Sequence, residues 1–291
     1  MSFKYNLSVC VSVKNEAKYM PEFIEHYVNQ GVDHFYIVNN NSSDNIEEMV
    51  QSCKHKDMIT FITDNRDVNI YIDVSATEHQ KAIWNDNIYP LIVKETEWAI
   101  IIDADEFMYG KNGHTIKTYL STLSDHINCV YVIWNLMLPN KDENNNVIKN
   151  FSIKQPSKRL NYDLISDVHL SMQRLSNFGK SIIKPAMINP NYKIWVHKQI
   201  TTNTLTNYNI FFEYPTSDNI NGHEWSEENY KKTNITLNHY PIRDLNDYEK
   251  RKSHLQYYFK SIFTNTMFLM MELEDKYLIE DNEINTLNII N

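Results

Sequence analysis

Glycine is unusually scarce in this 291-residue sequence, with 5 glycines against 37 asparagines. Neither G-x-G-x-x-G nor G-x-x-x-x-G-K-[ST] occurs, so the sequence lacks the glycine-rich loops that hold dinucleotides and nucleoside triphosphates. Cysteine is rare as well, and Cys10, Cys53 and Cys129 are too widely spaced to predict a disulfide framework or a zinc ribbon. Any phosphate ligand therefore has to be held by other groups, and a cation bound by carboxylates is the obvious substitute.

Basic residues are outnumbered, since 28 Lys and Arg face 37 Asp and Glu and the net charge is -9. This balance argues against a nucleic-acid partner, because neutralising phosphates requires a surplus of basic residues. No run of about 18 apolar residues occurs, and the N-terminus lacks the pattern of a signal peptide. We therefore expect no transmembrane segment and a cytoplasmic location, which would be the host cytoplasm if the source is viral.

Short apolar runs alternate with amphipathic segments over the first 110 residues. The runs predict strands at 7–13, 34–38, 58–63 and 98–102, and helices are predicted to follow the first three. This alternation is typical of a parallel α/β sheet, in which ligands bind at the carboxyl ends of the strands. Polar clusters follow three of these strands, at 14–16, 39–44 and 103–106. We expect the three clusters to converge on one site.

The sequence Asp103-Ala104-Asp105 directly follows a predicted buried strand. Side chains alternate along a strand, so the two Asp side chains lie on one side and can bind one hard cation. Mg²⁺ or Mn²⁺ held by one or two carboxylates and by substrate phosphates is the expected arrangement. The tripeptide alone also fits a solvated turn. Its position, with Glu106 beside it, favours a metal site because three buried carboxylates without a cation would be costly.

Two stretches together resemble glycosyltransferases of the GT-A superfamily, closest to the family 92 and family 2-like group. They are VCVSVKNEAKYMPEFIEHYVNQGVDHFYIVNNNSSDN at 9–45 and WAIIIDADEF at 98–107. The Asn-, Ile- and Lys-rich composition resembles that of giant-virus or AT-rich bacterial members. The resemblance implies an α/β GT-A (Rossmann-like) mixed sheet flanked by helices, with a C-terminal helical segment. We expect a catalytic domain at 1–243, divided into a nucleotide-binding half (1–110) and an acceptor-side half (111–243). Residues 244–291 would then be a helical extension that packs on the domain or on a partner in a homodimer.

The resemblance also implies roles for individual residues. The donor nucleotide and its phosphates would be contacted by Lys14, Asn15, Glu16, Asn39, Asn40, Ser42, Asp44, Gln80, Lys81 and Lys180. Asn39 stands where many members have Asp. Asp103 and Asp105 would hold the metal and the diphosphate, with Glu106 orienting them or touching the sugar. His239, in a stretch similar to a later H-Y element of the family, would complete the metal sphere.

The implied reaction is an inverting transfer of a hexosyl or N-acetylhexosaminyl group, with a UDP-sugar as the expected donor and a glycan or lipid-linked acceptor. Such a reaction needs a general base, which no motif identifies. Acids in the acceptor-side half that are available for this role are Asp163, Asp167 and Glu224.

Aromatic residues available as sugar platforms are Trp134, Tyr162, Trp195 and Trp225, although such residues more often pack in a core. The alternatives are a nucleotidyltransferase acting on sugar phosphates and a non-catalytic sugar-nucleotide or glycan-binding module.

Overall fold

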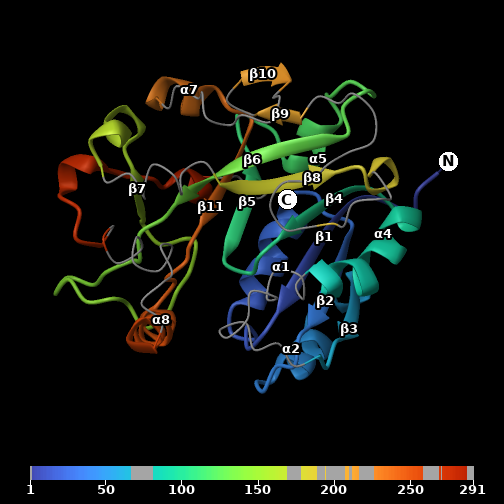
Figure 1. Cartoon of the computed structure of the whole chain (residues 1–291), viewed down its shortest axis with the longest axis horizontal. Helices are drawn as coiled ribbons and strands as arrows, with labels where there is room; N and C mark the ends of the chain where they lie inside the picture. Colours follow the sequence, from blue (N-terminus) through green and yellow to red (C-terminus); the bar gives the residue numbers. More distant parts are fainter. Residues whose placement is uncertain are drawn as a thin grey trace.

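A large mixed β-sheet organises the chain (Figure 1). The computed structural model describes residues 2–66, 81–168, 178–188, 194, 207–209, 212–215, 226–257, 269 and 271–286. The main path of the sheet has the order β10-β9-β6-β8-β4-β1-β2-β3. Within it β3, β2, β1 and β4 are parallel, and β8 is inserted antiparallel between β4 and β6. β11 pairs with the end of β6 and with β5, so the sheet branches there.

The strands of this sheet are β1 (Tyr5–Val13), β2 (His34–Asn39), β3 (Ile59–Thr63), β4 (Thr96–Ile102), β5 (Glu106–Gly110), β6 (Cys129–Leu136), β8 (Gly179–Ile183), β9 (Asn207–Asn209), β10 (Phe212–Pro215) and β11 (Ile235–His239). A separate two-stranded sheet pairs β7 (Lys158–Leu160) with β12 (Leu278–Glu280). The α-helices are α1 (Met20–Asn29), α2 (Ile46–Ser52), α4 (Tyr89–Glu95), α5 (Ile116–Leu120), α7 (Glu227–Lys232) and α8 (Leu245–Tyr257). A π-helical turn, η2 (Trp84–Ile88), leads into α4, and short 3₁₀ turns are η1 (Lys56–Met58), η3 (Tyr162–Asp167), η4 (Pro185–Met187), η5 (Asp275–Tyr277) and η6 (Glu283–Thr286).

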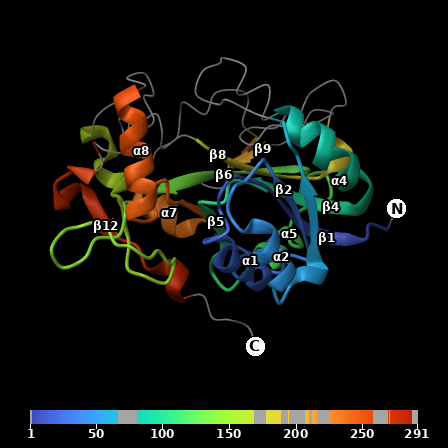
Figure 2. The same cartoon turned by 90° about the horizontal axis from the view of Figure 1, so that it is seen from below.

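The alternation of side chains along the parallel strands produces two hydrophobic cores. One face of β1 and β2 packs Val9, Val11 and Phe35 against α1 and α2. The other face packs Cys10 and Tyr36 against the segment of η2 and α4. Figure 2 shows α1 and α2 on one side of the sheet and α4 on the other. Because both faces are covered, the central strands read as continuous apolar runs.

The predicted mixed α/β sheet flanked by helices is confirmed, as are the four predicted strands within one or two residues of their bounds. Gly31 follows α1 with φ +85°, the left-handed conformation expected after a helix. Asn45 is the N-cap residue of α2, and the neighbouring Asp44 accepts the backbone N–H of Ala17.

The C-terminal region is only partly helical. α8 begins at Leu245, as expected for a helical extension from residue 244. Residues 278–280, however, form the strand β12, which pairs antiparallel with β7. The division of the chain into two halves and an extension stays a prediction. Among the described residues, no helix is both long enough and apolar enough to cross a membrane.

Candidate active site

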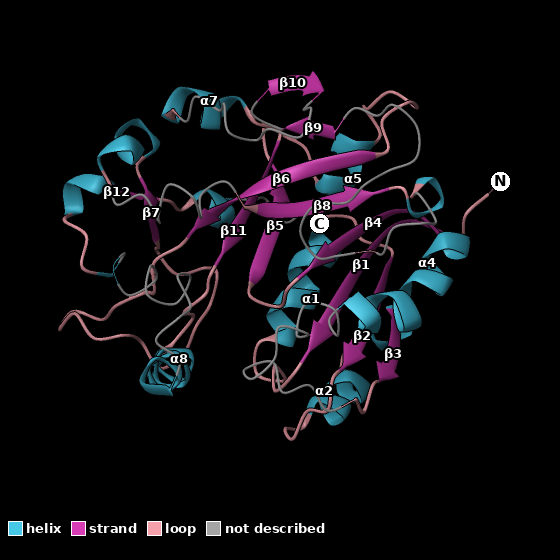
Figure 3. Cartoon of the chain, in the orientation of Figure 1, coloured by secondary structure: helices cyan, strands magenta, loops and turns pink. Residues whose placement is uncertain are grey.

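Five strands, β4, β5, β6, β8 and β11, contribute residues to one edge of the sheet (the strands are drawn in Figure 3). Asp103 and Asp105 follow the carboxyl end of β4, and antiparallel β8 begins at the same edge with Lys180. Trp134 lies two residues before the end of β6, and the last residue of β11, His239, pairs with Glu106 of β5. The antiparallel insertion of β8 is what places a lysine beside the aspartates, because its first residues lie where its neighbours end.

A buried lysine forms the centre of this site. The Lys180 ammonium pairs with the carboxylate of Asp103 and lies 3.3 Å from Glu106 Oε2, and the side chains of Lys180 and Glu106 are both 0% exposed. The backbone N–H of Asp103 donates to Glu106 Oε2 at 3.1 Å, which closes the turn. Burial raises the pKa of Glu106 to about 7, and the attraction of Lys180 opposes this shift. Burial also disfavours the Lys180 ammonium, but Asp103 and Glu106 outweigh it and raise the lysine pKa.

Asp105 faces a histidine. His239 Nε2 lies 3.5 Å from Asp105 Oδ2, and the imidazole packs against the indole of Trp134 with 4.4 Å between ring centroids. Two ligands of one Mg²⁺ or Mn²⁺ ion, each at about 2.1 Å, lie roughly 3 Å apart when adjacent. The Asp105–His239 pair therefore fits a divalent ion. Among the described residues, no group of three or more potential ligands surrounds such a position. A bound ion would thus need further oxygen ligands, such as those of a diphosphate.

The predicted donor-site residues in the loops after β1 and β2 hold those loops to each other. Asn15, with φ 60°, accepts the backbone N–H of Ser43 at 2.7 Å, and its own N–H donates to Ser42 Oγ at 3.0 Å. Asn39 Oδ1 accepts the N–H of Ser42 at 3.0 Å. The two loops thus form one rigid unit beside Asp103, in which Asn15, Asn39, Ser42 and Asp44 fix the backbone.

Glu16 belongs to a buried ion network that the sequence did not reveal. Arg243 Nη1 donates to Glu16 at 2.7 Å, and its Nε donates to Asp247 at 2.6 Å. The guanidinium also lies 3.6 Å from the ring centroid of Tyr19. Burial raises the pKa of Glu16, and Asp105 contributes to the shift in the same direction. Arg243 therefore connects the loop after β1 to the start of α8. The one feature of the sequence that indicated an ion pair for Arg243 was its position four residues before Asp247.

A second missed cluster lies at the end of β3. The carboxylate of Asp64 accepts the guanidinium of Arg66 at 2.9 Å and the amide of Asn87 at 2.6 Å. The Arg66 hydrogen bonds hold the pKa of Asp64 well below its usual range. Asn40 donates weakly to the carbonyls of both residues at 3.4 Å. Because this cluster follows a parallel strand, the rule that located the other polar loops would have found it.

The remaining predicted residues lie elsewhere or outside the described residues. Asp163 is exposed and accepts the N–H of Glu227 at the start of α7, at 3.0 Å. Asp167 is exposed and accepts the hydroxyl of Ser166 at 3.4 Å. Lys81 lies at the start of the helical segment that leads into η2. Gln80 and Glu224 lie outside the described residues, as do Trp195 and Trp225.

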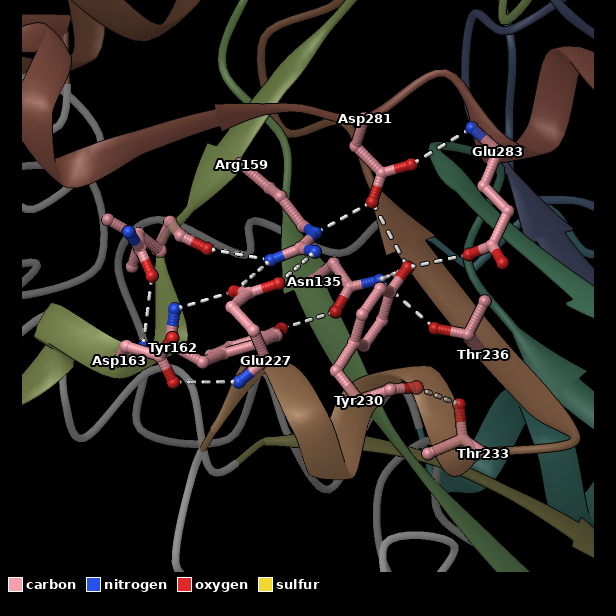
Figure 4. Close-up of polar contacts among 12 residues, drawn as sticks. Asn135, Arg159, Tyr162, Asp163, Glu227, Tyr230, Thr233, Thr236, Asp281 and Glu283 are labelled. Carbon is pink, nitrogen blue, oxygen red and sulfur yellow. Dashed lines mark hydrogen bonds and ion pairs between the residues drawn. The ribbon is translucent and has the colours of Figure 1, made fainter.

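A buried polar network supports the site from the opposite face of β6 and β11 (Figure 4). The Asn135 amide donates to Thr236 at 3.0 Å, to Asn238 at 2.9 Å and to the Tyr230 hydroxyl at 3.3 Å, and its carbonyl accepts the Tyr162 hydroxyl. Arg159 joins Asp281 at 2.6 Å and Glu227 at 2.8 Å in the same network. Asn135 directly follows Trp134 on β6, and Asn238 directly precedes His239 on β11. The network therefore fixes the two strands that carry these two rings.

Comparison with known proteins identifies the family. The model of glycosyltransferase family 92 matches residues 5–254. The chain belongs to glycosyltransferase family 92. A family 92 protein of Oryza sativa subsp. japonica is 26% identical over 121 residues, which is 41% of this chain and 19% of the rice protein. The matched part is thus a small fraction of that relative.

Solved structures resemble this family 92 chain over part of its length. TarS of S. aureus, residues 1–349, matches with a TM-score of 0.35 and 15% identity over 64% of this chain and 49% of TarS. The mannosyltransferase Ktr4p of S. cerevisiae, in complex with GDP, matches with a TM-score of 0.31 and 14% identity over 47% of this chain and 42% of Ktr4p. The family resemblance read from the sequence is confirmed by the family model, and family 92 membership supports sugar transfer as the class of activity.

Proposed function

We propose that this family 92 chain transfers a sugar from a nucleotide-diphosphate donor to an acceptor hydroxyl with the aid of Mn²⁺ or Mg²⁺. The observation that carries the proposal is the Asp105–His239 pair, 3.5 Å apart, beside the buried Lys180 at the carboxyl edge of the sheet. An imidazole ligand favours Mn²⁺ over Mg²⁺, which prefers oxygen ligands. Family membership supports the class of reaction.

The donor nucleotide would lie over the rigid loops after β1 and β2. These loops carry Lys14 and Asn40 on the side of Asp103 toward β3. The Asp64–Arg66 pair follows β3 and is linked to the second loop by Asn40. Their backbone is fixed by Asn15 and Ser42 before any ligand binds, which reduces the entropy cost of binding. By the family resemblance, a UDP-sugar is the expected donor.

The side chains at the edge of the sheet differ in exposure, and their proposed roles differ accordingly. Asp105 is 18% exposed and His239 only 6%, and these two would hold the ion. When bound, the ion would neutralise charge that develops on the departing diphosphate. Lys180 and Glu106 are fully buried, so they would act by orienting Asp103 rather than by touching the donor. The contact between His239 and Trp134 keeps the imidazole directed at Asp105.

Inversion of the anomeric centre would need one base that accepts the proton of the acceptor hydroxyl. Asp163 holds the start of α7 in this structure, which makes it a weaker choice than an acid with no capping role. Asp167 and Glu224 stay predictions for this base. The transferred sugar, the glycan or lipid-linked acceptor and a homodimer also stay predictions.

A nucleotide-release assay tests the proposal. The purified protein is incubated with Mn²⁺ or Mg²⁺ and with individual UDP- and GDP-sugars, and free UDP, GDP and pyrophosphate are quantified. Release of a nucleoside diphosphate supports sugar transfer, whereas pyrophosphate release would indicate a nucleotidyltransferase. Metal-dependent nucleotide binding without turnover would favour a binding module, and adding candidate acceptors checks that outcome.

Variants at the metal pair sharpen the test. Asp105→Ala and His239→Ala should each weaken Mn²⁺-dependent UDP binding by about tenfold or more, measured by calorimetry. Asp57→Ala is the matched control, because Asp57 is an exposed aspartate on η1. If Asp105→Ala binds Mn²⁺ and UDP as tightly as the control, the ion is held elsewhere and the proposed site is wrong.

A further inference from the structure

An exposed aromatic side chain stands beside the candidate active site. Phe178 is 42% exposed, and it immediately precedes β8, two residues before Lys180. Single exposed apolar residues are common on protein surfaces and need no explanation by themselves. Met187 is a second example, with 39% exposure on the turn η4. Phe178 differs from Met187 because its side chain packs against another aromatic ring, that of Trp134.

A row of three rings in contact, Phe178, Trp134 and His239, connects Phe178 to the proposed metal ligand. The ring of Phe178 stacks on the indole of Trp134 with 5.9 Å between centroids and 28° between planes. Trp134 in turn contacts the His239 imidazole at 4.4 Å. The backbone N–H of Trp134 donates to the Phe178 carbonyl at 3.0 Å, which fixes the two residues to each other. Phe178 is therefore held one ring away from His239.

The position of this row relative to the donor site indicates what it would bind. Along the sheet, the loops proposed to hold the nucleotide follow β1 and β2, on one side of β4. Trp134 belongs to β6 and Phe178 immediately precedes β8, and both strands lie on the other side of β4. With neighbouring strands about 4.8 Å apart, a sugar attached to the diphosphate at Asp105 would lie between the two groups. The space next to Phe178 is then where an acceptor would approach.

The chemistry of the row fits a neutral sugar ring. The face of an aromatic ring carries partial negative charge, and the C–H bonds on one face of a pyranose present partial positive charge to it. Trp134 is only 4% exposed and Phe178 is 42% exposed, so a sugar would reach the row at Phe178. The Lys180 ammonium, 5.8 Å from the Trp134 centroid, is already paired with Asp103 and is fully buried, so the row offers no exposed cation to an acidic sugar from that lysine.

We propose that Phe178, backed by Trp134, is the platform that binds the acceptor sugar through its apolar face. This inference rests on the proposed function and adds the acceptor subsite to it. Tyr or Trp at this position would preserve the platform, whereas Ala would remove it. The nucleotide and the metal would be unaffected, because Phe178 contacts neither Asp105 nor the loops after β1 and β2 in the contacts described above.

The test measures sugar and nucleotide binding separately. The probes are the methyl glycosides of glucose, galactose, mannose and N-acetylglucosamine, titrated one at a time with Mn²⁺ and UDP present and followed by saturation-transfer NMR. Wild type, Phe178→Tyr and the control Met187→Ala should bind at least one glycoside with similar affinity. Phe178→Ala should raise the Kd of that glycoside about tenfold, which corresponds to ~1.4 kcal/mol. UDP binding by calorimetry should be the same in all four proteins.

Two outcomes would overturn the platform. One is a Phe178→Ala variant that binds the glycoside as tightly as wild type, and the other is a wild type that binds UDP but none of the glycosides. A wild type that binds a glycoside through Phe178 but neither Mn²⁺ nor UDP would refute the proposed donor site alone. The two proposals therefore fail in distinguishable ways.

Discussion

Replacing Lys180 by methionine tests the electrostatic centre of the site. The ammonium of Lys180 is fully buried and is shared by Asp103 and Glu106, of which Glu106 is also fully buried. Methionine keeps a similar length and apolar stem but removes the charge. Without this cation, Glu106 would be buried either as an unpaired carboxylate or as the protonated acid, because burial already raises its pKa. Water reaches Asp103 but not Glu106. The variant should therefore be destabilised even in the absence of any ligand.

The size of the effect follows from the burial of the pair. Removing one partner of a buried ion pair costs about 3–5 kcal/mol, because the remaining charge is left unpaired. Unfolding entropy of about 2.1 cal/mol/K per residue, applied to this chain, converts that loss to a decrease in Tm of roughly 5–8 °C. Adding Glu106→Gln to Lys180→Met should recover part of the loss, since the double variant no longer buries a carboxyl group that must be either unpaired or protonated.

Differential scanning calorimetry in the absence of divalent ions measures the change in Tm. Lys154→Met, at an exposed lysine, is the control and should unfold within about 1 °C of wild type, since exposed substitutions cost little. Adding Mn²⁺ should raise the Tm of Lys180→Met more than that of wild type, because the ion can replace the missing positive charge. If Lys180→Met unfolds at the wild-type temperature without metal, the carboxylates do not depend on Lys180 and the electrostatic account is wrong.

Three further predictions concern the groups that support the site. Arg243→Met should lower the free energy of unfolding by about 3–5 kcal/mol in urea titrations, because Glu16 and Asp247 lose a buried partner; full stability of the variant would contradict this. Asn135→Leu should cost about 3 kcal/mol and weaken Mn²⁺ binding, because buried hydroxyl and amide groups around it lose a partner; unchanged Mn²⁺ affinity would show that the network does not position His239. Burial lowers the pKa of His26 to about 4, so the unfolded chain binds the extra proton first and stability should fall as the pH drops from about 6.5 toward 4. His26→Gln should lose about 2 kcal/mol less than wild type between pH 7 and pH 5, measured by urea unfolding, and equal losses would refute the assignment.

The parallel part of the fold could be predicted because its strands and loops follow local patterns of apolar and polar residues. β1, β2 and β4 are apolar on both faces, and each is followed by a polar loop, so periodicity alone located the edge at which Asp103 and Asn39 lie. Position after a strand also identified Asn15 and Ser42. What could not be predicted is that their side chains accept backbone N–H groups across the two loops, since that depends on distances between segments 27 residues apart.

The buried ion pairs escaped prediction for a different reason. Lys180 was expected to meet a phosphate, and only the antiparallel insertion of β8 between β4 and β6 places it against Asp103 and Glu106. Arg243 and Glu16 are 227 residues apart in sequence, and neither has a pattern that marks it as buried. Charged residues are almost never buried unless paired, so sequence reasoning places them on the surface by default. Long-range pairing of charges is therefore the part of this site that only the three-dimensional fold reveals.

In the proposed function, the distribution of charge around the site would allow a diphosphate to bind without a glycine-rich loop. Asp103 and Glu106 share the Lys180 ammonium on one side, and Glu16 shares the Arg243 guanidinium with Asp247 on the other. Asp105 lies between these two internal pairs and faces His239, a group that can be neutral and can bind a metal. The carboxylate best placed to attract a divalent ion is thus the one whose neighbour is not a permanent cation. In the proposed function, this arrangement would direct a metal to Asp105 and His239, and a metal there could bind a diphosphate in the absence of a glycine-rich loop.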